Sequence, residues 1–521
     1  MRLLACGSLG LSLTFVGAFA AGQDGQKTQA QVTQSTISTP SFHEDVIGEL
    51  SPGSELQDLA ASEHHIAWVE KQGGSRTVRL DGKQQGGVYE EVKYLAGSPD
   101  ETHLAFFGKR VSKWFLVMDG QELAKEYTKT SSLAFQPKGT SLAYCACAEK
   151  KCRLVVDGAD TGAEYEDISY PQYSPDGKKI AYLAKRGKRW IAVVDGKEVG
   201  PELGDYLDFG FDSDGNRFYV AGRVGNHWRL SYAVDGGAGP EFEVLSPIAF
   251  SSDGKHYAYA GTVSQTGFKK EKVFGTIVLD GQGTERYEGK GVSRLTWRAF
   301  AGSKVSLTQG LRDFSAEFDG LSNPAFNSEG KLVYAAPREK GETAVLVGSN
   351  SGPAFEEILS PIIFTDHSKH FVYVGKRGDG FVEVRDNVPG PTVAAGNRGP
   401  TAVEWIALTD DAAHIAYETA SGAEYFKGRS RRALRSLVID GHDGPQYDAL
   451  DLASFQFDKE AHHYFYVVTG AKGDQNLFIV DGHESKLYDE VVGAHFLENG
   501  ESAGFVARDG IRFLRVTYAI R

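Results

Sequence analysis

Methionine and cysteine are scarce in this chain, which has two of the first and four of the second in 521 residues. After the first twenty residues, no apolar run approaches the length of about 20 residues that a membrane-spanning helix needs. The zinc-peptidase spacing His-Glu-x-x-His does not occur, and "GSNSG" from Gly348 lacks the Gly-x-Ser-x-Gly spacing of many serine hydrolases. The sequence therefore offers no transmembrane segment beyond its start and no zinc-peptidase motif.

Basic residues are also fewer than acidic residues. The chain has 56 Lys and Arg against 69 Asp and Glu, which gives a net charge of −13. A surplus of negative charge argues against nucleic acid or an anionic membrane as the partner of the whole surface, although a local basic patch remains compatible with it. The 62 glycines and the 11% of aromatic residues are typical of a globular chain with many turns.

The amino terminus has the pattern of an export signal. Arg2 precedes an apolar stretch, and Ala18-Phe19-Ala20 provides small residues for cleavage before Ala21. We therefore expect residues 1–20 to be a signal peptide and the mature protein to be periplasmic or secreted, with a membrane anchor as the alternative. Residues 21–44 are mostly Gln, Thr, Ser and Gly, so they are predicted to be a disordered linker.

What the chain has in abundance is repetition. An Asp-Gly pair, usually after two apolar residues, recurs at Asp81, Asp119, Asp157, Asp195 and Asp235, about 40 residues apart. Between these pairs lies a second signal, seen as "SPDGKKIAYLA" from position 174 and "SSDGKHYAYAG" from position 251. Self-similarity at a period near 40 predicts a repeat architecture.

One repeat, residues 169–206, illustrates the expected local structure. Its turn at positions 174–177 joins two strands, and the second of these, "KKIAYLA", alternates with a period of two. "WIAVV" is a third strand, and Asp195-Gly196 is a two-residue hairpin turn before a short outer strand. Four antiparallel strands in about 40 residues describe a propeller blade.

The fold prediction is therefore an all-β propeller protein with about twelve four-stranded repeats. Two six-bladed propellers in tandem, 45–290 and 291–521, fit this number, and a seven-plus-five split is the alternative. The last repeat has no outer strand of its own. The segment "EDVIGEL" near Asp45 could supply it and close the sheet by pairing the two ends of the chain.

The repeat resembles the WD40-like PD40 repeat of TolB-like bacterial exported propellers, and the resemblance covers most of residues 45–521. It implies an exported propeller. It does not imply one function, because this class includes protein-binding periplasmic components and propeller domains attached to serine peptidases.

Three cysteines remain after signal removal: Cys145, Cys147 and Cys152. In an oxidising compartment we expect a cross-strand disulfide between Cys147 and Cys152, with Cys145 buried or free, and a three-thiolate metal site as the alternative. The recurring Asp-Gly carboxylates and the pairs His64-His65 and His462-His463 fall at turn positions of the repeat. We therefore predict no metal site and no cofactor.

The loop between the second and third strands is rich in Lys and Arg. One interpretation is structural: these cations pair with neighbouring carboxylates. The other is functional: they form a binding surface. Two loops are longer and combine aromatic with basic side chains, a mixture enriched at contact hot spots. The predicted partner-binding residues are Phe268, Lys269, Lys270, Tyr425, Phe426, Arg429, Arg431 and Arg432.

Two functions remain open. The first is a non-enzymatic binding or scaffold propeller whose partner is a protein or an envelope polymer. The second is an enzyme of lyase, lactonase or glycosidase type that acts at a central channel, which requires unusual acidic or basic residues on several inner strands. Those strands are mostly apolar or aromatic, as in "LAFQ" and "IIFT", so the first function is favoured and no catalytic residue is predicted.

Overall fold

The computed structural model describes residues 42–225, 231–266, 271–289, 324–338, 341–360, 362–365, 369–378, 380–394, 406–409, 413–421, 425–426, 429–430, 434–458, 460, 462–472, 474–497 and 501–520. These residues form β-strands and turns, and they contain no α-helix. Within them, no helix of membrane-spanning length and apolarity occurs. The predicted signal peptide, residues 1–20, lies outside the described residues.

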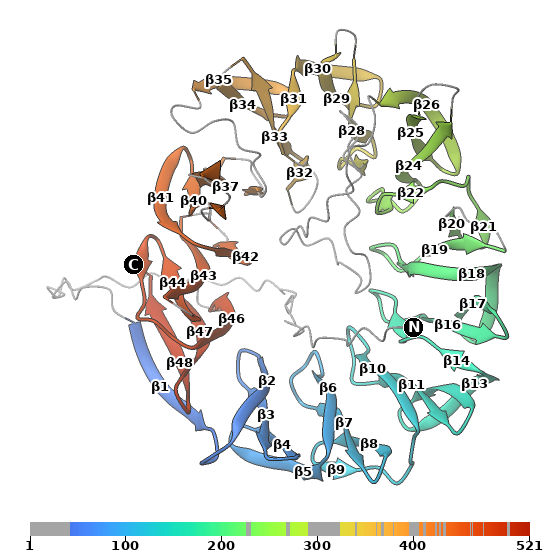
Figure 1. Cartoon of the computed structure of the whole chain (residues 1–521), viewed down its shortest axis with the longest axis vertical. Coiled ribbons are helices and arrows are strands. Elements are labelled where there is room, and N and C mark those ends of the chain that lie inside the picture. Colours follow the sequence, from blue (N-terminus) through green and yellow to red (C-terminus); the bar gives the residue numbers. More distant parts are fainter. Residues whose placement is uncertain are drawn as a thin grey trace, which may run out of the picture. The chain divides into compact units, whose positions relative to one another are not determined.

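The strands run in chain order through a series of sheets (Figure 1). The first are β1 (Phe42–Glu49), β2 (Glu55–Ala61), β3 (Ile66–Gln72), β4 (Ser75–Leu80), β5 (Lys83–Tyr89), β6 (Glu91–Gly97), β7 (Leu104–Arg110), β8 (Lys113–Met118), β9 (Gln121–Glu122), β10 (Lys129–Phe135), β11 (Leu142–Ala148), β12 (Lys151–Val156) and β13 (Ala159–Tyr165). The next are β14 (Asp167–Ile168), β15 (Gln172–Tyr173), β16 (Ile180–Arg186), β17 (Arg189–Val194), β18 (Lys197–Phe211), β19 (Phe218–Val224), β20 (Ser231–Val234), β21 (Gly237–Ala238), β22 (Val244–Leu245), β23 (Ala249–Phe250), β24 (Tyr257–Thr266), β25 (Glu271–Leu279) and β26 (Gln282–Gly289). There follow β27 (Ala325–Phe326), β28 (Leu332–Pro337), β29 (Thr343–Val347), β30 (Asn350–Phe355), β31 (Glu357–Ile358), β32 (Ile363–Phe364), β33 (Phe371–Arg377), β34 (Gly380–Arg385), β35 (Val388–Ala394), β36 (Ile406–Leu408), β37 (Ile415–Ser421), β38 (Tyr425–Phe426) and β39 (Arg429–Ser430). The last are β40 (Leu434–Ile439), β41 (His442–Tyr447), β42 (Leu450–Phe457), β43 (Tyr464–Lys472), β44 (Gln475–Val480), β45 (His483–Glu484), β46 (Glu490–Phe496), β47 (Ser502–Asp509) and β48 (Arg512–Ala519).

Each repeat is an antiparallel meander of four strands, as in the order β10-β11-β12-β13. The long strand β18 serves twice, as the outer strand of one repeat and the first strand of the next. Counted this way, the described residues contain eleven four-stranded repeats. The all-β propeller fold is thus confirmed. The predicted seam near residue 290 lies outside the described residues, and the division into two propellers stays a prediction.

The Asp-Gly turns explain why the repeat signal is so regular. In each of these turns the aspartate has a positive φ, such as 50° at Asp119, and the glycine after it also has one, 76° at Gly120. Two residues with positive φ make the type I′ turn that matches the twist of a hairpin. The Asp119 carboxylate also accepts a hydrogen bond from the Leu104 backbone N–H at 3.0 Å, which fixes the start of the second strand.

Aromatic residues at the end of the outer strand pack against the next repeat. The rings of Tyr89 and Phe355 lie over glycines of the following sheet, Gly108 and Gly375. A Cβ atom at either glycine would lie 2.3–2.4 Å from ring carbons, so only glycine fits there. This packing places buried hydrophobic clusters between consecutive sheets.

The amino-terminal strand completes the last sheet. β1 pairs antiparallel with β48, from Phe42 opposite Tyr518 to Glu49 opposite Arg512, which confirms the expected pairing of the two chain ends. The strand begins earlier than the expected boundary at Asp45 because the Phe42 ring packs on Tyr518, with ring centroids 4.8 Å apart. Glu44 adds a hydrogen bond accepted from the Tyr488 hydroxyl at 2.6 Å.

By internal contacts the chain divides into two compact units. Among the described residues, one unit contains those within 42–111, 116–122 and 456–520, and the other contains those within 112–115 and 123–455. The first unit joins residues from both ends of the sequence because β1 belongs to the sheet of β46, β47 and β48.

Candidate functional site

The two long loops predicted to contact a partner depart from the usual repeat. Most connections between second and third strands are two-residue turns, such as Gly73-Gly74 between β3 and β4 or Glu149-Lys150 between β11 and β12. In contrast, β24 and β25 are lengthened, pairing as far as Thr266 opposite Glu271. The connection between β37 and β40 contains an additional hairpin, β38 with β39.

Only part of the predicted contact set lies within the described residues. Tyr425 and Phe426 form β38, and they pair with Ser430 and Arg429 of β39, respectively. The hairpin therefore brings one predicted aromatic position, Phe426, opposite one predicted basic position, Arg429, in the backbone register. Phe268, Lys269, Lys270, Arg431 and Arg432 lie outside the described residues.

Many basic residues of the shorter loops are paired with carboxylates. Arg110 donates a hydrogen bond to Glu122, Arg186 does so to Glu198, and Lys109 lies 3.4 Å from Glu91. Exposed pairs of this kind contribute little to stability. These ion pairs matter more for binding than for stability, because they already neutralise much of the positive charge of the short loops.

Two of these pairs are part of a repeated arrangement between consecutive sheets. The Tyr165 hydroxyl donates to Glu198 at 3.2 Å, and the Arg186 guanidinium lies 6.0 Å from the centre of the Tyr165 ring. Tyr89, Glu122 and Arg110 repeat this arrangement. Burial raises the pKa of Tyr165, and the Glu198 carboxylate raises it further, so the phenol stays a hydrogen-bond donor. We attribute a structural role to these charged residues.

Histidines pair with the aspartates of the Asp-Gly turns. In each pair the histidine Nδ1 lies 2.6–2.7 Å from the aspartate Oδ2, and the histidine precedes the second strand of its repeat. The pairs are His65–Asp81, His103–Asp119, His256–Asp280, His370–Asp386, His414–Asp440 and His463–Asp481. Because the His–Asp pair recurs at the same position of the repeat, we assign it a role in stabilising the turn. This agrees with the turn position assigned to His65 and His463 from the sequence.

Carboxylates are also present on first strands, where an enzyme would need them. Glu490 on β46 and Asp58 on β2 both have a raised pKa, in each case chiefly because the surrounding protein limits hydration of the carboxylate. The charge of Asp58 raises the pKa of Glu490 further, whereas Arg508 opposes the shift. On β18, Asp208 is buried and accepts a hydrogen bond from the Tyr219 hydroxyl at 3.0 Å. Glu490 belongs to the acid pair Asp489-Glu490, and such pairs recur at the entry to successive repeats, so its sequence context favours a structural or surface role; Asp58 and Asp208 have no comparable sequence signal.

The sequence contains a Gly-x-Ser-x-Gly match at residues 500–504. In α/β-hydrolases this serine lies on a sharp turn between a strand and a helix. Here Ser502 is the first residue of β47, directly opposite Ala519 of β48, and its carbonyl accepts a hydrogen bond from the Leu497 N–H at 2.8 Å. A serine within a β-ladder does not have the nucleophile geometry of that family.

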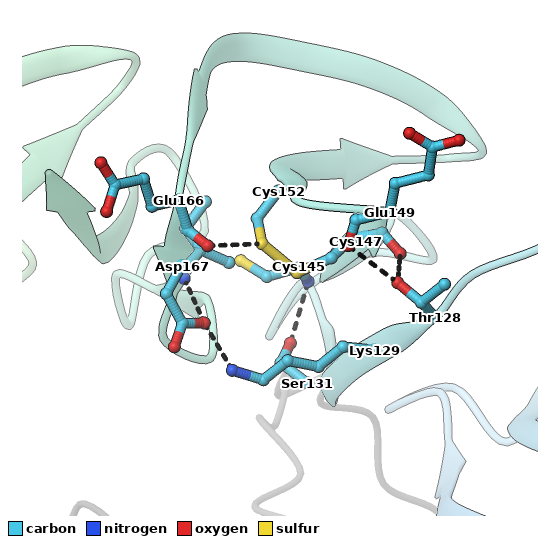
Figure 2. The surroundings of a disulfide bond; sticks show 10 residues. Thr128, Lys129, Ser131, Cys145, Cys147, Glu149, Cys152, Glu166 and Asp167 are labelled. Carbon is cyan, nitrogen blue, oxygen red and sulfur yellow. Dashed lines mark hydrogen bonds and ion pairs between the residues drawn. A yellow bond between two sulfur atoms is a disulfide. The ribbon is translucent and has the colours of Figure 1, made fainter. Parts of the chain in front are cut away.

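The cysteines lie together in the β11–β12 hairpin (Figure 2). Cys147 and Cys152 are directly opposite in the register and joined by a disulfide. Cys145 is the free cysteine of the described residues; it is buried, and its N–H donates to the Ser131 hydroxyl at 2.9 Å. Burial raises the pKa of the Cys145 thiol, which therefore stays protonated and a poor nucleophile.

Asp167 lies next to the disulfide. It is the first residue of β14, the strand that follows β13 in the chain. Its carboxylate forms an ion pair with Lys129 of β10. Together with the two bonded sulfurs, a carboxylate oxygen of Asp167 completes a group of three potential ligand atoms within 4.8 Å of one another.

No protein-family model matches this chain, and no curated protein matches it. Among solved structures, it is similar to TolB from Acinetobacter baumannii, with 15% identity and a TM-score of 0.24 over 43% of this chain and 65% of that one. It is also similar to the β-propeller domain of the Trilobed protease from Pyrococcus furiosus, with 14% identity and a TM-score of 0.25 over 61% of this chain and 98% of that one. A third similar structure is the acylaminoacyl peptidase of Pyrococcus horikoshii, with 14% identity and a TM-score of 0.26 over 73% of this chain and 57% of that one. The matched region thus spans less than two thirds of the TolB chain, and similarities at this level carry no argument about function.

Proposed function

We propose that this protein is an exported, non-enzymatic propeller that binds a protein or an envelope polymer through its two long loops. The observation that carries the proposal is the added hairpin β38–β39, inserted where several other repeats have a two-residue turn. Loops on a rigid scaffold are where binding residues most often occur. The paired cations of the short loops favour the long loops as the contact region.

The proposal includes the expectations that the sequence supports and the fold is compatible with. Residues 1–20 direct export and are removed, residues 45–290 and 291–521 form two propellers, and the protein acts in the periplasm or outside the cell. The contact set is Phe268 to Lys270 with Tyr425, Phe426 and the arginines 429, 431 and 432. Its mixture of rings and cations is suited to a partner with apolar and acidic groups.

The test is to replace residues 422–433 with a two-residue Asn-Gly turn, and to capture partners from native envelope extract with the tagged mature chain. We expect capture to fall at least tenfold while the melting temperature changes little, because these residues lie outside the four-stranded ladder of β36, β37, β40 and β41. As a matched control, Val111-Ser112 between β7 and β8 is replaced with Asn-Gly, and capture should be unchanged. Undiminished capture by the loop variant, or a large fall in melting temperature, would contradict the proposal.

A second candidate function is catalysis by acids on first strands. Asp58 and Glu490 favour it, since burial raises the pKa of each carboxyl above its ordinary value, and this is the direction that suits a general acid. The double variant Asp58→Asn, Glu490→Gln distinguishes the two functions. It should leave partner capture intact, whereas a hydrolytic or lyase activity on envelope polysaccharide would be lost.

A further inference from the structure

The Cys147–Cys152 disulfide and Asp167 form the group of potential metal ligands in the part of the chain that the structure describes. Both cysteines are at most 5% exposed, and the Asp167 side chain is 31% exposed. The three residues come from β11, β12 and β14, so paired strands fix the position of each one. Figure 2 shows Asp167 on one side of the two sulfurs and Lys129 below it.

The hydrogen bonds around Asp167 orient its carboxylate. The Ile168 N–H donates to Oδ1 at 2.8 Å, and the Lys129 ammonium donates to the same oxygen. Both bonds therefore use Oδ1, and Oδ2 accepts neither of them. Outer-shell hydrogen bonds of this kind orient a ligating carboxylate and tune its affinity for a metal.

We propose that Cys147, Cys152 and Asp167 form a binding site for a thiophilic divalent cation such as Zn²⁺ when the disulfide is reduced, and that the oxidised protein has this site closed. Two thiolates and one carboxylate, with water in the fourth position, make a tetrahedral ligand set that Zn²⁺ accepts. In the disulfide neither sulfur is a thiolate, so the strong ligands are absent. The state of one bond thereby decides whether a metal binds.

Reduction of the Cys147–Cys152 disulfide, which opens the site, uses an external dithiol as the reductant. The S–S bond accepts two electrons and two protons and becomes two thiols, while the dithiol forms its own disulfide. Metal binding then displaces the two thiol protons to solvent. Lys129 has only to move its flexible side chain, since the cation takes over its role of neutralising Asp167.

Cys145 is the competing third ligand, because it lies on the same face of β11 as Cys147. It is not a member of the three-atom group, whereas Asp167 is. The proposed site therefore has two sulfurs and one oxygen. The three-thiolate site considered from the sequence differs from it in one ligand, and this difference can be tested.

The test uses the full mature chain with Co²⁺ as a spectroscopic substitute for Zn²⁺. The protein is reduced anaerobically with a phosphine, which leaves as the phosphine oxide with oxygen from water, and excess reductant is removed before titration. We expect one Co²⁺ per reduced chain with thiolate-to-cobalt charge-transfer absorption, and none for the oxidised chain. Asp167→Asn should weaken binding at least about tenfold, since even outer-shell groups contribute that much. Cys145→Ser should bind as the wild type does.

Several results would overturn the proposal. One is equal Co²⁺ binding by the reduced wild type and by the double variant Cys147→Ser, Cys152→Ser. Another is that Cys145→Ser loses the charge-transfer absorption while Asp167→Asn retains it. This result would assign the third ligand to Cys145. The near-UV circular dichroism of the reduced, metal-free chain is the control for folding. Its collapse would also count against the site, because the ligands depend on the strand register.

Discussion

Two neighbouring repeats solve the same structural problem in different ways. Where the β11–β12 hairpin has Cys147 opposite Cys152, the β16–β17 hairpin has Lys185 opposite Trp190. The first pair is covalent. In the second, the Lys185 ammonium lies 5.5 Å from the centre of the indole, and the indole packs edge-on against Tyr206 with ring centroids 4.9 Å apart.

The difference teaches that the repeat prescribes a position and not a residue. The cross-strand pair one step before the turn lies at the end of the hairpin, and this position accepts either a large ring that packs on another strand or a cross-link between the two paired strands. A ring contributes buried area and stacking. A disulfide contributes by restricting the unfolded chain, and its two sulfurs give chemistry that a tryptophan does not have.

The largest effect in this comparison is expected for Trp190→Ala. The indole is partly buried and contacts Tyr206 and Lys185, so its loss should lower the free energy of unfolding by about 2–3 kcal/mol, below the range for fully buried rings. Urea unfolding followed by circular dichroism measures this. Lys185→Met, which removes the cation and keeps an unbranched side chain of similar length, is the matched control and should cost less than about 1 kcal/mol. Equal costs for the two variants would show that the ring does not dominate.

A smaller effect is expected when the disulfide is removed by Cys147→Ser with Cys152→Ser. The two cysteines are five residues apart in sequence, and a loop this short yields about 2 kcal/mol in the chain-entropy account. Cys145→Ser keeps the disulfide and serves as the control. Thermal unfolding of the oxidised proteins compares them. If the double variant proves as stable as the wild type, the hairpin end is held by the surrounding packing alone.

The same comparison shows what could be predicted from the sequence. The Asp-Gly turns and alternating strands determine the fold because each repeat satisfies its turn chemistry locally, and even the pairing of β1 with β48 follows from the missing outer strand. Contacts between repeats, in contrast, could not be predicted from the sequence. Asp167 beside the sulfurs and Glu44 at Tyr488, 444 residues away in sequence, depend on how one sheet meets another, for which no local pattern exists. Glu490 is visible in the sequence as part of the pair Asp489-Glu490, but its electrostatic interaction with Asp58 depends in the same way on how one sheet meets another.

The smallest effect concerns Glu164 on β13, in the repeat that carries the disulfide. Lys151 and Arg153 of β12 hold the pKa of this exposed carboxyl below its usual range, chiefly through hydrogen bonds from their side chains. Because the folded pKa is lower than the unfolded pKa of about 4.3, the pair stabilises the protein above that pH, and the stabilisation is lost as the pH falls through the folded pKa. Glu164→Gln should therefore lower the melting temperature slightly at pH 7 and leave it unchanged at the lowest pH at which the protein remains folded. A variant that is equally destabilised at both ends of the pH range would show that the loss comes from packing and not from the ionised carboxylate.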